Sequence, residues 1–105
     1  FTHLLAVNGI ELQDWGLGEH DKKFIIRLMQ GLRPNSPWPA DIRRSESKRF
    51  LFDIVANKRN GIDVDKLDYF MRDSMSCFGK LPDIYVDRIV QCARVCICDG
   101  QTQIC

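Results

Sequence analysis

Four polar side chains between positions 65 and 73 have spacings that can support chemistry on a charged substrate. Asp65, Tyr69 and Asp73 are spaced four residues apart, and Lys66 follows the first of them. At about 100° per residue, this spacing aligns the three oxygen-bearing side chains along one side of a helix. A carboxylate there can bind a divalent cation, and a lysine can bind a phosphate. The pattern also fits a solvated helix face whose charges pair along the helix, and spacing does not decide between these interpretations.

The five cysteines are a second group of reactive side chains. They occupy positions 77, 92, 96, 98 and 105, a spacing that matches no zinc signature. Free thiols are the simplest interpretation. Asp99-Gly100 between alternating residues predicts a two-residue hairpin turn, which would place Cys96 diagonally from Cys105 on one face. Diagonal Cα atoms lie about 7–8 Å apart, a little too far for an unstrained disulfide, but a one-residue change in loop length would make the two cysteines direct neighbours. A reversible redox switch between Cys96 and Cys105 is therefore a hypothesis that stands beside free thiols.

Composition and charge exclude several classes of protein. The 105 residues are 45% hydrophobic and 28% charged, with 15 Lys or Arg against 14 Asp or Glu, so the formal net charge is +1. Such a chain is not intrinsically disordered, and its short basic pairs predict weak or no nucleic-acid binding. No apolar run approaches the roughly 18 residues of a membrane span, so we expect no membrane partner. The chain begins at Phe1, and we expect it to be a piece of a longer protein.

The elements that position these side chains are predicted to be mainly helical. Apolar residues recur at helical spacing between capping residues and Gly or Pro breaks. Ser45 is expected to start one helix, and Trp15 and Leu17 are expected to anchor an irregular segment. Asp63 is expected to cap the helix that carries the charged line, which is the set Asp65, Lys66, Tyr69 and Asp73. The predicted helices cover Phe1 to Val7, Asp21 to Gln30, Glu46 to Lys58, Asp63 to Cys77 and Asp83 to Arg94, and Val95 to Cys105 forms a β-hairpin.

A long run of residues around the charged line resembles a known family. The segment from Phe52 to Asp73 closely resembles part of the SAM-and-HD-domain deoxynucleoside triphosphate triphosphohydrolases of animals. His3-Leu4, Asn8-Gly9-Ile10, Trp38-Pro39 and Ala93-Arg94-Val95-Cys96 follow in the family's order, so the resemblance covers essentially the whole chain. It implies an HD-domain-like helical fold, with this chain as the C-terminal part of the HD domain.

The resemblance implies a metal-dependent enzyme that cleaves a dNTP to a deoxynucleoside and inorganic triphosphate. In this family a His, a His-Asp pair and a distant Asp bind a divalent metal, for which Zn, Fe, Mn and Mg all suit the pattern. Asp65 matches the last metal ligand and Lys66 a phosphate contact. Tyr69 matches a residue beside the substrate sugar, and Asp73 an acid that binds its 3′-hydroxyl. In the family, the other metal ligands lie before the segment that aligns with the start of this chain at Phe1. We therefore expect the isolated chain to be inactive.

Further partners of the parent protein follow from the resemblance alone. Arg88 aligns with an arginine that contacts an activating nucleotide at a subunit junction. GTP or dNTP activators, a homotetramer and a nuclear location are therefore implied for the parent. The stretch from Ser74 to Ile84 departs from the family's pattern, which keeps an alternative open. In that alternative the protein is a catalytically dead paralogue that acts as a nucleotide-binding or nucleic-acid-binding module.

One dipeptide spells the family's metal-binding pair without matching its position. His20-Asp21 lies after the segment that resembles Phe1, whereas the family's His-Asp pair precedes it. It stands at the expected start of a helix, where short polar side chains cap unpaired N–H groups. We therefore expect His20-Asp21 to cap the helix and not to bind a metal.

Overall fold

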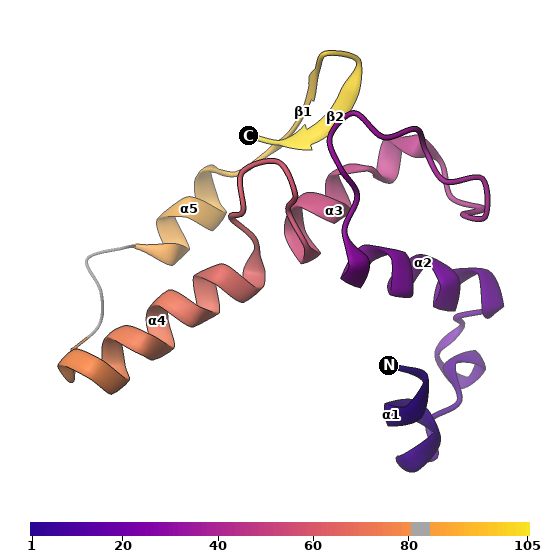
Figure 1. Ribbon diagram of the computed structural model, residues 1–105, viewed down its shortest axis with the longest axis horizontal. Coiled ribbons are helices and arrows are strands. Elements are labelled where there is room, and N and C mark those ends of the chain that lie inside the picture. The colour runs from indigo at the N-terminus through magenta and orange to yellow at the C-terminus, as the bar shows by residue number, and fades with distance from the viewer. Residues whose placement is uncertain (81–84) are drawn as a thin grey trace.

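The computed structural model of the protein describes residues 1–80 and 85–105 and is mainly α-helical, with one antiparallel hairpin (Figure 1). This confirms the predicted fold class. The elements in chain order are α1 (Thr2–Val7), the 3₁₀ helix η1 (Leu12–Trp15), α2 (Glu19–Gln30), the 3₁₀ helix η2 (Glu46–Lys48), α3 (Phe50–Val55), α4 (Val64–Phe78), α5 (Val86–Cys92), β1 (Val95–Cys98) and β2 (Gln101–Ile104).

A small aromatic core holds α2, α3 and the segment between them together. Phe24, Ile42 and Phe52 are buried, and Trp38 packs against them. The rings of Phe24, Trp38 and Phe52 meet pairwise in tilted or edge-on contacts, with centroids 6.0 to 6.3 Å apart. This is the favoured geometry of aromatic pairs. The indole Nε1 of Trp38 donates to the carbonyl of Arg44 at 3.0 Å, so the ring packs without losing its hydrogen bond.

The molecule is more open than a compact domain of this length. Its radius of gyration is 16.2 Å, whereas a compact chain of 105 residues would have about 13 Å. Figure 1 shows α1 and α4 extending away from the α2–α3 core in different directions. The prediction that Trp15 is an anchor was wrong, because the residue is 77% exposed, whereas Leu17, the other predicted anchor, is half-buried. Among the described residues, no helix is long and apolar enough to cross a bilayer.

Helix α2 begins two residues earlier than predicted. Gly18 is its N-cap, in an extended conformation, and Asp21 lies inside the first turn. The carboxylate of Asp21 accepts a hydrogen bond from the Gly18 N–H at 3.0 Å and pairs with Arg44. The hydrogen bond from Arg44, followed by that from Gly18, lowers the pKa of Asp21. Asp21 therefore stabilises the helix start by reaching back to the cap, although it is not the cap itself.

The next helical stretch is shorter than predicted. Ser45 starts it as expected, because its hydroxyl accepts from the Ser47 N–H at 3.2 Å. However, the stretch consists of η2 followed by α3, and α3 ends at Val55 instead of Lys58. The reason lies at Asn57, whose side-chain oxygen accepts from the N–H of Arg59 at 2.9 Å and so turns the chain out of the helix.

The C-terminal hairpin has the predicted register. Cys96 lies opposite Gln103, and Cys98 lies opposite Gln101. Asp99 and Gly100 both have positive φ, 52° and 76°, as a two-residue hairpin turn of this kind requires. Helix α5 precedes the hairpin and ends at Cys92, before the predicted Arg94, and its predicted start at Asp83 lies outside the described residues.

Candidate functional site

Helix α4 carries the charged line, and Asp63 fixes where that helix begins. One carboxylate oxygen of Asp63 accepts from the Lys66 N–H at 3.1 Å, which satisfies an otherwise unpaired donor of the first turn. The other accepts from the Asn57 N–H at 2.9 Å, which ties the helix start to the end of α3. The predicted cap is therefore confirmed. Asp65, Tyr69 and Asp73 lie within α4 at one-turn intervals along the same side.

On the exposed side of α4, Tyr69 interacts with two other members of the charged line, Asp73 and Lys66. A hydrogen bond with Asp73 raises the pKa of Tyr69, and the negative charge of Asp73 adds to the effect. The ammonium of Lys66 lies 5.5 Å from the centroid of the Tyr69 ring, within the range of a cation–π contact. All four side chains, including Asp65, are exposed. The arrangement thus presents one carboxylate, one ammonium and one phenol–carboxylate pair to a ligand.

The solvated-face interpretation also finds support on this helix. Asp68 and Arg72 form an ion pair one turn apart, on the same exposed surface. Such exposed pairs contribute only a few tenths of a kcal/mol. Charge pairing along the helix and a ligand-facing line therefore coexist on α4.

The described residues do not make a complete metal site. No group of three or more His, Cys, Asp or Glu side chains in residues 1–80 and 85–105 is placed to hold a metal ion. Asp65 supplies a single carboxylate, and a hard divalent cation takes several oxygen or nitrogen ligands. The donor set present here does not fit a metal by itself.

Arg88 lies on a different element from the charged line. It is exposed in the first turn of α5, and its N–H donates to the carbonyl of Tyr85 at 3.1 Å. The role of Arg88 in binding an activator stays a prediction.

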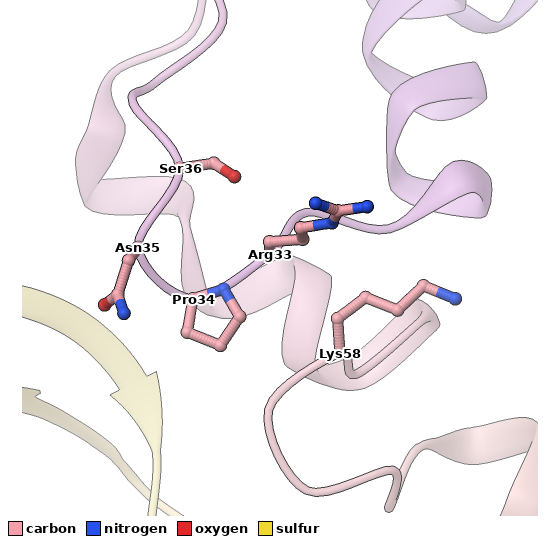
Figure 2. A pocket seen from close by; sticks show the side chains of 5 residues that line it. All are labelled: Arg33, Pro34, Asn35, Ser36 and Lys58. Carbon is pink, nitrogen blue, oxygen red and sulfur yellow. The ribbon is translucent and has the colours of Figure 1, made fainter.

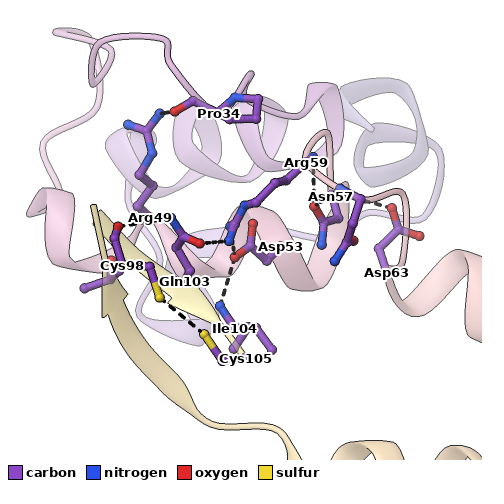
Figure 3. A network of polar contacts seen from close by, with 12 residues as sticks. Pro34, Arg49, Asp53, Asn57, Arg59, Asp63, Cys98, Gln103, Ile104 and Cys105 are labelled. Carbon is purple, nitrogen blue, oxygen red and sulfur yellow. Dashed lines mark hydrogen bonds and ion pairs between the residues drawn. The ribbon is translucent and has the colours of Figure 1, made fainter. Parts of the chain in front are cut away.

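A buried carboxylate connects the hairpin to α3, which sequence reasoning missed. Asp53 is only 9% exposed and accepts from the Ile104 N–H at 3.0 Å and from the guanidinium of Arg59 (Figure 3). The same guanidinium donates to the side chain of Gln103. An acid within the apolar stretch of a predicted helix was the only signal in the sequence. The network continues through Asn57, so that contacts link the hairpin to the start of α4.

The hairpin brings two sulfur atoms together, and they are not the predicted pair. The Sγ atoms of Cys98 and Cys105 lie 3.6 Å apart (Figure 3). The hydrogen bond with Cys98, followed by one with Cys96, raises the pKa of the Cys105 thiol to about 11. A redox switch between Cys96 and Cys105 stays a prediction. Sequence reasoning missed Cys98 as a neighbour of Cys105, because the hairpin register places Cys98 two residues farther than Cys96 from the strand position beside Cys105.

Comparison with known proteins identifies relatives along the whole chain. The chain is 41% identical over 112 aligned residues to the deoxynucleoside triphosphate triphosphohydrolase SAMHD1 of Homo sapiens, and 39% identical over 115 to that of Danio rerio. Each match covers 100% of this chain and 18% of the relative. A match of 44% over 66 residues covers 60% of this chain and 11% of the SAMHD1 homolog of Dictyostelium discoideum.

No protein-family model matches the chain. The chain spans about one fifth of the length of the Homo sapiens and Danio rerio relatives. At about 40% identity, over its whole length, it is related to one region of the SAMHD1 family of deoxynucleoside triphosphate triphosphohydrolases.

Proposed function

We propose that the protein carrying this chain is a triphosphohydrolase that cleaves a dNTP to a deoxynucleoside and inorganic triphosphate. The chain would form the C-terminal part of its HD domain. The observation that carries the proposal is the line of Asp65, Tyr69 and Asp73 with Lys66 on α4. It is supported by whole-chain similarity to proteins named as deoxynucleoside triphosphate triphosphohydrolases.

Each member of the line has a role that its chemistry suits. The Lys66 ammonium offsets the negative charge of the polyphosphate. Tyr69 lies beside the substrate sugar, next to Asp73, whose hydrogen bond and negative charge raise the pKa of Tyr69. Asp73 accepts a hydrogen bond from the sugar 3′-hydroxyl. Asp65 offers one ligand to a divalent metal, of Zn, Fe, Mn or Mg type, whose remaining ligands are not among the described residues.

The proposal extends to the regulation of the parent protein. Arg88 would contact a GTP or dNTP activator at a subunit junction of a homotetramer located in the nucleus. The exposed guanidinium on α5 suits a phosphate partner, because its fork can bind two oxygens at once.

Substitution of Asp65 in the intact protein that carries this chain tests the proposal. Asp65→Ala is expected to lower dGTP hydrolysis about 100-fold or more, the usual scale for losing a group that organises charge at a reacting phosphate. Asp68→Ala is the matched control, since Asp68 lies on the same helix and forms an ion pair with Arg72. Release of inorganic triphosphate is measured by anion-exchange chromatography. Equal activity of the wild type and Asp65→Ala would refute the role of Asp65.

The isolated 105-residue chain is proposed to lack this activity, because its donor set is incomplete. Hydrolysis of dGTP by the folded chain alone, abolished by Asp65→Ala, would contradict this. The alternative of a catalytically dead paralogue predicts a different result for the intact protein: it would bind dGTP without releasing triphosphate. Equilibrium dialysis beside the chromatographic assay separates the two.

A further inference from the structure

An open pocket lies between the segment that follows α2 and Lys58, which lies in the turn that follows α3. It has a volume of about 620 Å³, which is in the range of small-ligand sites. Its lining consists of Arg33, Pro34, Asn35, Ser36 and Lys58 (Figure 2). None of the four charged-line side chains on α4 lines it, so the pocket is separate from the site proposed above.

A buried arginine holds the segment that forms one wall of the pocket. Arg49 is only 6% exposed, and its Nη2 donates to the carbonyls of Arg33, Pro34 and Ser36 at 3.2, 2.9 and 2.8 Å. Figure 3 shows the contact with Pro34. The Ser36 N–H also donates to the Arg33 carbonyl at 3.1 Å, which closes a turn. Because these carbonyl oxygens are bound to a cation, the wall is fixed and its negative dipoles are already neutralised.

A glycine positions the opposite wall. A Cβ atom at Gly31 would lie 2.6 Å from Cε and 2.9 Å from Cγ of Lys58, so the lysine stem lies directly against the Gly31 backbone. Only a residue without a side chain permits this approach. The contact holds the stem of Lys58, which is an exposed residue, and Figure 2 shows its ammonium pointing in the same direction as the Arg33 guanidinium.

The pocket lining has positive charges without a negative one. Arg33 and Lys58 contribute two cations, Asn35 an amide and Ser36 a hydroxyl, and the lining contains no carboxylate. In residues 1–80 and 85–105, no ion pair to a carboxylate is formed by Arg33 or by Lys58. A concave surface with charge of one sign concentrates counter-ions of the other sign.

We propose that this pocket binds a small anion that carries a phosphate chain, either free or on a nucleotide. The guanidinium of Arg33 matches two phosphate oxygens, and the ammonium of Lys58 adds a point charge. Ser36 supplies a neutral hydroxyl donor at the rim. The proposal rests on this pocket alone and does not depend on the function of the α4 line.

Binding of inorganic triphosphate to the intact protein, measured by calorimetry in EDTA, tests the proposal. All variants carry Lys66→Gln, so that binding at α4 is reduced equally in each. The double variant Arg33→Gln, Lys58→Gln is expected to bind at least about tenfold more weakly than its parent, since a charge-assisted hydrogen bond is worth about that factor even when partly exposed. The charge-keeping variant Lys58→Arg is expected to retain binding.

Arg43→Gln is the matched control, because Arg43 is exposed and outside the pocket. Far-UV circular dichroism confirms that each variant is folded. Equal affinity of the double variant and its parent would overturn the proposal, as would an equal loss in Arg43→Gln. Parallel titrations with dATP and with a short single-stranded DNA oligonucleotide separate the sources of the anion. Preference for the nucleotide would specify the ligand, and preference for the oligonucleotide would overturn the small-anion proposal.

Discussion

Replacing Asp53 with asparagine tests how the hairpin is held against α3. The side chain keeps its size, but the carboxylate that accepts from Ile104 and from Arg59 loses its charge. The amide oxygen of asparagine can still accept from the Ile104 N–H, but a hydrogen bond to a charged acceptor is worth about 1 kcal/mol more than one to a neutral acceptor. The charged bond from Arg59 adds about 1 kcal/mol more, which is below the usual range because the arginine side chain is 31% exposed. Asp53→Asn should therefore lower the free energy of unfolding by about 2 kcal/mol.

Urea unfolding of the protein that carries this chain measures this loss. For a small domain, a loss of about 2 kcal/mol lowers the urea concentration at the unfolding midpoint by about 1 M. Asp41→Asn is the matched control, because the pair of Asp41 with Arg27 is nearly half exposed on both sides and should be worth less than 1 kcal/mol. Hydrogen exchange at the Ile104 amide adds a local readout, and it should become faster only in Asp53→Asn. An equal effect of the two substitutions, or unchanged exchange at Ile104, would refute the reasoning.

Three further predictions concern single positions. Gly31→Ala should destabilise the protein by about 1–3 kcal/mol in urea unfolding, because φ 78° and ψ 163° belong to a region that only glycine adopts readily. Asp73→Ala should lower the pKa of Tyr69 towards its ordinary value, as measured by ultraviolet titration of tyrosinate, since the main cause of its elevation is removed. Cys98→Ala should likewise lower the pKa of Cys105 from about 11, as measured by the pH dependence of iodoacetamide labelling with peptide mass spectrometry.

Each of these predictions has a control in the same chain. Gly18→Ala should cost less than about 1 kcal/mol, because Gly18 has negative φ and open space around it, so only the preference for glycine over alanine at an N-cap is lost. Asp68→Ala should leave the Tyr69 titration unchanged, and Cys92→Ala should leave that of Cys105 unchanged. Any control that matches its test variant would contradict the corresponding assignment.

The sign of the pH effect at Cys105 follows from the direction of its shift. A thiol whose pKa is raised on folding contributes stability below its ordinary pKa and loses that contribution as the pH rises through the folded value. The contribution is therefore complete below about pH 9 and lost by about pH 11. Thermal melts across this window should show a smaller decrease in Cys98→Ala than in the wild type.

Local elements were the most predictable part of the fold. Asp63 as a cap, Gln30 as the last residue of a helix and Asp99-Gly100 as a turn were all confirmed, because each depends on contacts within a few residues. The end of α3 was wrong because Asn57 pairs with a residue beyond the helix, which apolar periodicity does not report.

The sequence by itself determined the line of Asp65, Tyr69 and Asp73, because the pitch of a helix fixes which side chains share a face. Only the tertiary structure decided the partners of Asp53 and of Arg49. The Asp53 contact joins residues 51 positions apart, and the Arg49 contacts lie between a helix and a proline-rich segment. Such pairs depend on how separate elements pack around a shared core, and neither spacing nor residue type encodes that packing.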